Sequence, residues 1–138
     1  MKKQIKVTPK QLQIKIWEEC KRIIKIRYGN ECYTCGIKDL KGSNRHTGHL
    51  IPKKYLPYQY KYDLRFLRPQ CYNCNMNLGG MGAIYYDNLL WEIDKNDLFN
   101  FVTDVQKQKK LQQENKPKQK EVVEFYSNLL ERLKLINK

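Results

Sequence analysis

Four cysteines stand in two pairs of identical spacing. They are Cys32-x-x-Cys35 and Cys71-x-x-Cys74, and 35 residues separate the pairs. Two thiolates at this spacing can bind one metal ion, and two such pairs form a closed tetrahedral site with four sulfur ligands. We therefore expect a structural zinc ion, because a site with four protein ligands leaves no position for a substrate. Loss of the metal is expected to unfold the middle of the chain.

Both histidines of the chain lie between the cysteine pairs, in the segment RHTGH that ends at His49. A neutral imidazole is a common general base. Alternation along a strand would place His46 and Gly48 on one face and His49 on the other. Asn75 directly follows Cys74, so zinc would hold it near this strand. Two interpretations stay open: His49 activates a water while His46 and Asn75 hold a divalent ion, or the histidines are polar residues of a solvated strand.

These motifs resemble those of the ββα-metal (HNH) nucleases. The closer resemblance is to the NinG (Rap) family of phage recombination proteins, and endonuclease VII-type junction resolvases share the four-cysteine arrangement. The family pattern is C-x-x-C-G, H-x-G-H, Q-C-x-x-C-N, L-x-G and then a tyrosine five residues beyond the last glycine. The matching residues here are Cys32, Cys35 and Gly36; His46, Gly48 and His49; Gln70, Cys71, Cys74 and Asn75; Leu78 and Gly80; and Tyr85. The match covers roughly residues 30 to 90.

The resemblance implies a divalent-metal-dependent endonuclease that acts on branched DNA, such as Holliday junctions and D-loops. It implies that His49 is the general base and that Asn75 is a ligand of a catalytic Mg²⁺ or Mn²⁺ ion. Many relatives have Asp immediately before the catalytic His, where this chain has Gly48, so His46 is the candidate replacement ligand. Phe66 stands where the family usually has Asn, and Arg68 where it has His. These departures keep one alternative open, a non-catalytic zinc-dependent nucleic-acid-binding protein. A further alternative is an HNH nuclease that cuts linear duplex DNA, which ranks lower because nothing in the sequence resembles a base-reading recognition helix.

The composition favours a polyanionic partner. The chain of 138 residues carries 27 Lys and Arg against 14 Asp and Glu, a net charge of +13. Nucleic acid is the first expectation and an anionic membrane surface the second. The residues expected to neutralise phosphates are Arg45, Lys53, Lys54, Lys61, Arg65 and Arg68. Tyr55, Tyr58, Tyr60 and Tyr62 are expected either to stack on unpaired bases or to pack around the zinc site.

Partners and location follow from the same composition. A four-way junction is two-fold symmetric and needs two cuts, which favours a homodimer. We expect no membrane partner, because no apolar run approaches the ~20 residues that span a bilayer. The N-terminus has no apolar segment of a secretory signal. We therefore expect a cytoplasmic location, for a phage protein in a bacterial host or a prophage-encoded one, with reduced cysteines.

The elements that must position these residues form an α+β fold. Thr8 and Pro9 predict the start of a helix over residues 9–28, with Cys20 on its apolar face. Loose alternation predicts a strand over 61–67. Further helices are expected over 84–93, from 96–97 to about 109, and through the apolar positions between Val122 and Ile136. The basic segment 106–120 is expected to be a linker or a frayed helix end. We expect the chain to have three parts. They are an N-terminal basic helix (residues 1–29), a zinc-containing HNH-like ββα core (30–95) and a C-terminal helical extension (96–138).

Overall fold

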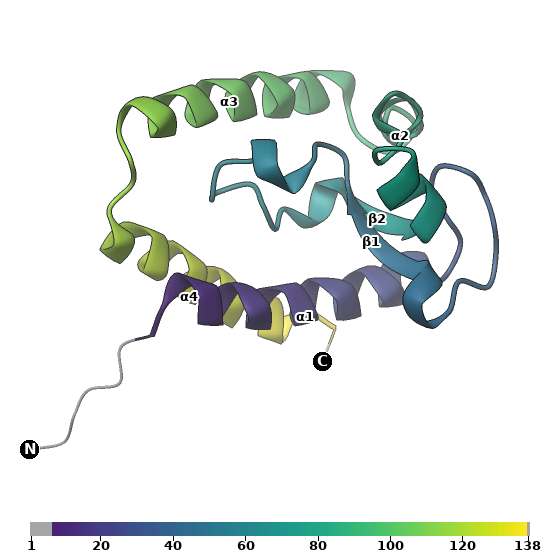
Figure 1. Cartoon of the computed structure of the whole chain (residues 1–138), viewed down its shortest axis with the longest axis horizontal. Helices are drawn as coiled ribbons and strands as arrows, with labels where there is room; N and C mark the ends of the chain where they lie inside the picture. Colours follow the sequence, from purple (N-terminus) through teal and green to yellow (C-terminus); the bar gives the residue numbers. More distant parts are fainter. Residues whose placement is uncertain (1–6, 138) are drawn as a thin grey trace, which may run out of the picture.

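The computed structural model describes residues 7–137 of the chain and has an α+β fold, as expected. Its elements are α1 (Pro9–Tyr28), β1 (Arg45–His49), β2 (Leu67–Cys71), α2 (Gly82–Leu89), α3 (Lys95–Glu114) and α4 (Gln119–Leu135). Helix α3 runs along one side of the molecule and α1 and α4 along the opposite side (Figure 1). The segment between β1 and β2 lies between these two sides, and the sheet and α2 lie toward one end. None of the helices in the described range 7–137 could span a membrane.

Helix α1 has the bounds that the sequence predicts. Thr8 and Gln11 form a reciprocal capping box, in which the Thr8 hydroxyl accepts from the Gln11 N–H at 3.2 Å and the Gln11 side chain accepts from the Thr8 N–H at 3.0 Å. Pro9 occupies the first turn, where its missing N–H costs no hydrogen bond. Gly29 ends the helix with a positive φ of 69°. Cys20 is fully buried on the apolar face, which confirms its expected place in the core.

The two strands form one antiparallel pair that holds the histidines in register. His46 lies opposite Gln70, Gly48 opposite Arg68, and His49 opposite Leu67. Every residue of β2 is buried, so this strand carries no alternation that would mark it in the sequence. The predicted strand over 61–67 is therefore wrong. Residues 61–66 form turns and a 3₁₀ turn (Leu64–Phe66), which Asp63 begins by accepting a hydrogen bond from the Arg65 N–H, and β2 begins only at Leu67.

Two apolar clusters hold the helices to the middle of the chain. In one, buried residues of α1 and α4 pack with Tyr62 and Leu67. In the other, Leu50, Phe66 and Tyr85 pack with α3. Arg22 of α1 also donates to the carbonyl oxygens of Leu133 (3.2 Å) and Ile136 (3.0 Å), which satisfies groups at the end of α4. Both long sides of the molecule are therefore fixed to the segment that carries the candidate site.

The C-terminal half is more helical than the sequence predicts. Helix α3 continues to Glu114, through much of the basic segment expected to be a linker or a frayed helix end. Its Phe101 and Val105 are buried, and Asp94 caps its first turn. The break before α4 covers only residues 115–118, around Pro117. Helix α2 begins slightly earlier than expected, at Gly82, and ends at Leu89.

Candidate functional site

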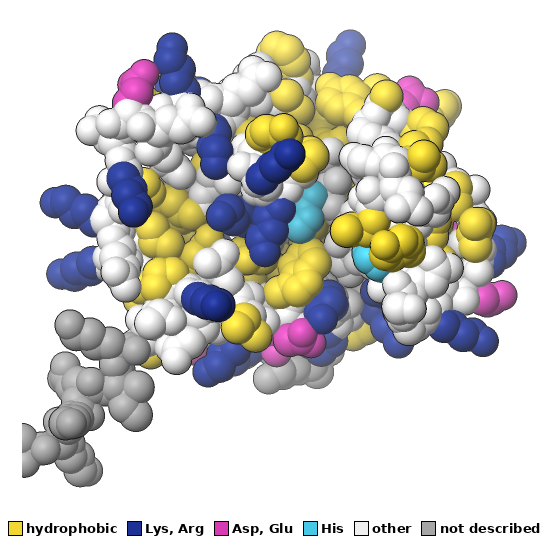
Figure 2. All heavy atoms as spheres, viewed as in Figure 1, with side chains coloured by type: hydrophobic (Ala, Val, Ile, Leu, Met, Phe, Trp, Pro, Cys, Tyr) yellow, Lys and Arg dark blue, Asp and Glu magenta, His cyan; other side chains and the backbone are white. Residues whose placement is uncertain are grey.

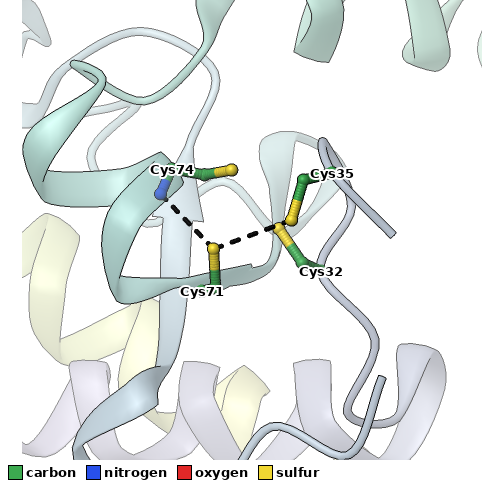
Figure 3. Close-up of side chains that lie close together, drawn as sticks. All are labelled: Cys32, Cys35, Cys71 and Cys74. Carbon is green, nitrogen blue, oxygen red and sulfur yellow. Dashed lines mark hydrogen bonds between the residues drawn. The ribbon is translucent and has the colours of Figure 1, made fainter. Parts of the chain in front are cut away.

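The four paired cysteines converge at one point. Their sulfur atoms all lie within 4.8 Å of one another, and those of Cys35 and Cys71 are 3.8 Å apart. Sulfur ligands around one tetrahedral zinc ion, each at about 2.3 Å, lie about 3.8 Å from each other. Figure 3 shows Cys32 and Cys35 on the loop after α1, facing Cys71 at the end of β2 and Cys74 in the turn that follows it. The donor set and spacing are compatible with a structural zinc ion.

Local turns aim the sulfur atoms of each pair. Gly36 has a φ of 80° and its N–H donates to the Cys32 carbonyl oxygen at 2.9 Å. The Cys74 N–H donates to the Cys71 sulfur at 3.4 Å. Burial raises the pKa of Cys32, but hydrogen bonds from backbone groups of the neighbouring cysteines and from Thr34 lower it to about 6. Burial raises the pKa of Cys74 to about 12, so binding of an ion to all four thiolates must release protons.

His49 is held in one tautomer. Its Nε2 lies 2.9 Å from the Lys61 carbonyl oxygen, which can only accept, so Nε2 carries the proton in the neutral ring. The lone pair is then on Nδ1. The ring stacks on Trp17 of α1, with centroids 5.3 Å apart and planes 10° apart. Burial lowers the pKa of His49 and the charge of Lys53 lowers it further, against the raising effect of the Lys61 carbonyl.

His46 and Asn75 are in direct contact. The Asn75 side-chain nitrogen lies 2.9 Å from His46 Nδ1, and His46 Nε2 lies 3.0 Å from the Ser43 carbonyl oxygen. The Ser43 carbonyl fixes the proton on Nε2, so His46 Nδ1 is the acceptor for Asn75. Asn75 lies in a π-helical turn, Asn73–Asn77, that continues directly from the second cysteine pair. The structure therefore brings together the two residues expected to share an ion.

Trp17 and Asn75 separate two adjoining hollows. One of about 280 Å³ is lined by Trp17, Thr47, His49, Pro52, Lys53, Asn75, Gly79 and Gly80. The other, about 260 Å³, is lined by Trp17, Lys21, Arg45, His46, Thr47 and Asn75. Thr47 borders both, and its buried hydroxyl has no hydrogen-bond partner among residues 7–137. His49 and the His46–Asn75 pair thus open onto the same region of the surface.

The side chain of Gln70, the diagonal neighbour of Gly48 on β2, leaves no room for a side chain at position 48. A Cβ at position 48 would lie 1.7 Å from Gln70 Oε1. Gln70 is fully buried, and its amide nitrogen donates to Thr34 Oγ1 (3.1 Å) and to the Gly80 carbonyl oxygen (2.9 Å). Gln70 therefore fills the space that an Asp at position 48 would need, and in return it ties the first cysteine pair to the loop at Gly80.

Phe66 and Tyr85 brace the strands around His49. The Phe66 ring stacks on Phe101 of α3, with centroids 3.7 Å apart. The Tyr85 hydroxyl lies 2.8 Å from the Gly48 carbonyl oxygen and 3.1 Å from that of Phe66. Burial raises the pKa of Tyr85 well above its usual range, so the hydroxyl remains a donor. Apolar packing of Phe66 and the Tyr85 hydroxyl therefore hold the backbone at positions 48 and 66.

The basic residues expected at phosphates lie in different places. Lys53 lines the hollow of His49, with its ammonium 5.9 Å from the Trp17 ring centroid. Arg45 lines the hollow of His46 and donates to Asn30 Oδ1 at 2.8 Å. Lys54 is exposed over Tyr55. Arg65 pairs with Asp63 at 2.7 Å and faces a separate hollow against α3.

The expected phosphate contact by Arg68 is wrong. Its side chain is 2% exposed and donates to the backbone carbonyls of Leu64, Arg65 and Leu67. The guanidinium lies over the ring of Tyr28, 4.2 Å from the centroid, and 3.6 Å from a Glu92 carboxylate oxygen. Burial against carbonyls and aromatic rings makes Arg68 a structural cross-link between α1, β2 and the α2–α3 loop.

Three of the four tyrosines expected near DNA serve in packing. Tyr58 packs against Phe125 and Tyr126, Tyr60 against Phe101, and Tyr62 is buried with its hydroxyl bonded to Gln13. Only Tyr55 of this set is exposed. The sequence carries no signal for their partners, because those partners lie on helices far along the chain.

Two residues of this region are missed by sequence reasoning. Trp17 stacks on His49 from α1, a contact across 32 positions that no local pattern records. Lys109 of α3 lies close enough to Lys61 that its charge, after burial, lowers the pKa of Lys61, and Lys53 adds to the effect. Figure 2 shows Lys and Arg side chains gathered in the middle of one face beside a histidine, with Asp and Glu toward the periphery.

The donors of His46 and Asn75 fit a divalent ion that keeps several waters. If the Asn75 amide turns over, its oxygen takes the place of the nitrogen that now lies 2.9 Å from His46 Nδ1. Adjacent ligands of an octahedral ion at about 2.1 Å lie about 3 Å apart. The pair offers no carboxylate, so water or phosphate oxygens must complete the ligand set.

Comparison with protein-family models, curated proteins and solved structures gave no match to this chain.

Proposed function

We propose that the protein is a divalent-metal-dependent DNA endonuclease of the HNH type that acts on branched recombination intermediates. One observation carries the proposal. His49, with Nε2 on the Lys61 carbonyl, opens onto a hollow that it shares with Asn75, and Asn75 contacts His46. A base with a free lone pair beside a nitrogen–oxygen donor pair is the arrangement that metal-assisted phosphodiester hydrolysis needs.

The residues of the chain have separate tasks in this reaction. His49 Nδ1 takes a proton from the attacking water, whose oxygen forms a bond to phosphorus. One ester P–O bond breaks, and the leaving oxygen takes a proton from solvent. Trp17 holds the imidazole plane and shields one face from water. His46 and Asn75 would hold the divalent ion, which when bound supplies positive charge to the phosphate.

Basic side chains around the hollow supply contacts to the DNA backbone. Lys53 lies beside His49, and Lys61 and Lys109 form a second basic group nearby. Such contacts neutralise phosphates without reading base sequence. This supports a substrate chosen by its structure. The four-cysteine site would hold zinc and fix the position of Asn75, without a role in the chemistry.

A substrate comparison tests this function. Zinc-loaded protein is incubated with a four-way junction, a D-loop and a linear duplex, each with Mg²⁺, with Mn²⁺ or with neither. We expect cleavage of the branched substrates, faster with Mn²⁺ than with Mg²⁺ because imidazole nitrogen suits Mn²⁺ better than Mg²⁺. Asn75→Ala, with its zinc content checked, is the matched control for contaminating nuclease and should be inactive. Equal cutting of linear duplex would instead indicate a nuclease without structural selectivity.

A non-catalytic zinc-dependent nucleic-acid-binding protein is the second candidate. Gly48 favours it, because Gln70 excludes the aspartate that many nucleases of this type place next to the base. In that case the junction binds tightly, no substrate is cut with any metal, and Asn75→Ala binds as well as the wild type.

A further inference from the structure

A third hollow lies beside His46. It has a volume of about 530 Å³ and is lined by Ser43, Asn44, His46 and Tyr72. Tyr72 is 47% exposed although it is aromatic. Its ring contacts that of His46 with centroids 5.4 Å apart and planes 80° apart, so the two rings are not stacked face to face. Half of the tyrosine surface is therefore free to contact a ligand.

The backbone of Tyr72 is fixed on both sides. The residue stands between Cys71, a member of the four-cysteine cluster, and the π-helical turn Asn73–Asn77. Its N–H donates to Asn44 Oδ1 at 3.0 Å, which also joins the two walls of the hollow. An aromatic ring on a fixed backbone loses little conformational entropy when a ligand stacks on it. The Asn44 amide group keeps its two N–H donors.

The position of the hollow indicates its occupant. It shares His46 with the ion site proposed above, so a DNA strand whose phosphate reaches that ion would bring a neighbouring base to Tyr72. Bases inside a duplex are already stacked on each other and cannot reach an aromatic side chain at the surface. A base that is unpaired presents a free face, and stacking on an aromatic ring is tolerant of base identity.

We propose that the hollow formed by Ser43, Asn44, His46 and Tyr72 binds one unpaired nucleobase next to the phosphate to be cut, with Tyr72 as its stacking surface. This inference rests on the proposed function and gives it a physical basis for the choice of branched DNA. It assigns the stacking role to Tyr72, in place of the tyrosines at positions 58, 60 and 62, whose rings pack against other aromatic side chains of the protein.

The test measures binding without cleavage. Zinc-loaded protein is titrated, without Mg²⁺ or Mn²⁺, into DNA that carries one bulged 2-aminopurine, and into the same duplex fully paired. The wild type should quench the fluorescence of the bulged base. Tyr72→Leu should weaken binding of the bulged DNA about 5- to 100-fold, remove the quenching and leave binding of the paired duplex unchanged. Tyr72→Phe should behave as the wild type, and so should Phe99→Leu, which changes an exposed aromatic side chain outside the hollow.

Three results would overturn the inference. They are unchanged quenching in Tyr72→Leu, an equal loss of affinity for both DNAs, and no quenching by the wild type. The last result decides the matter even if Tyr72→Leu loses zinc. Failure of the nuclease proposal would look different. No substrate would be cut, while the selective effect of Tyr72→Leu on bulged DNA would persist.

Discussion

The protonation state of His49 follows from two contacts. The Lys61 carbonyl holds the proton on Nε2, and burial beside Lys53 disfavours a second proton. A general base must be unprotonated to act, so these contacts prepare His49 for the role given to it. Lys53, which would bind a phosphate, also keeps the base neutral.

The pH dependence of cleavage should reflect this state. Because the pKa of His49 is lowered from 6.5, the acid limb of kcat/KM should have its midpoint below pH 6.5. Between the lowered pKa of His49 in the folded protein and its ordinary value of 6.5, the unfolded chain binds a proton that the folded chain does not. The contribution of His49 to the free energy of unfolding is therefore full above about pH 6.5 and is lost as the pH falls through the folded-state pKa. A pH–rate profile beside Lys53→Gln, which should move the midpoint upward, checks the assignment. A midpoint above 6.5 in the wild type would contradict it.

Gly48 and Gln70 form a coupled pair. Gly48→Ala should lower the free energy of unfolding by about 1–3 kcal/mol, because the new Cβ meets Gln70 Oε1. Gln70→Ala should cost a similar amount, since Thr34 and Gly80 lose a donor. The double variant should cost less than the sum of the two, because Gln70→Ala removes the clash. Urea unfolding of the four proteins measures the coupling, and strict additivity would show that the two residues are independent.

At the scale of elements, the two cysteine pairs hold β2, the π-helical turn and the loop after α1 in one place. Zinc removal should therefore destroy the Asn75–His46 contact while α1 and α4, which have their own apolar cluster, stay helical. Circular dichroism and metal analysis after chelation measure this. Cys71→Ser should lose zinc, whereas Cys20→Ala should keep it, because Cys20 is buried on the apolar face of α1, outside the four-cysteine cluster. Retention of zinc by Cys71→Ser would contradict the four-thiolate site.

The elements differ in how far the sequence could predict them. The capping residues and apolar period of α1 lie within one segment, and so its bounds are predictable. Strand β2 is buried on both faces by distant elements, so its local pattern gives no sign of a strand. Phe101 and Val105 give α3 a buried face, and this packing keeps a basic, low-complexity segment helical.

The residues of the candidate site also differ in how far the sequence could predict them. The spacing of the cysteines and the position of Asn75 after Cys74 are local, and from them the convergence of the four cysteines and the closeness of Asn75 to β1 could be predicted. Trp17, Lys109 and Tyr72 are recognised only once distant segments are in contact. Arg68 shows the reverse: its charge suggests a surface role, but tyrosine rings and backbone carbonyls enclose it.

Across the whole molecule, the effect of the net charge of +13 on DNA affinity depends on where the basic side chains lie. Lys61 lies in the segment that connects β1 to β2 and Lys109 lies on α3, so the two charges come close together only in the folded chain. Lys109→Gln should weaken binding to a four-way junction and reduce the slope of log K against log salt concentration by about 1. Lys110→Gln, the adjacent exposed position on α3, is the matched control and should change the affinity less. Equal effects of the two substitutions would mean that only net charge matters.

The proposed metal-dependent hydrolysis depends on His49 as its base. The most direct measurement is the single-turnover cleavage rate of a four-way junction with Mn²⁺, for zinc-loaded wild type and His49→Ala. The predicted result is a loss of about 10²- to 10⁴-fold in His49→Ala, with zinc content and junction affinity unchanged. Cleavage by His49→Ala at the wild-type rate would show that His49 is not the base, and tight binding without cleavage by either protein would show that the protein is not a nuclease.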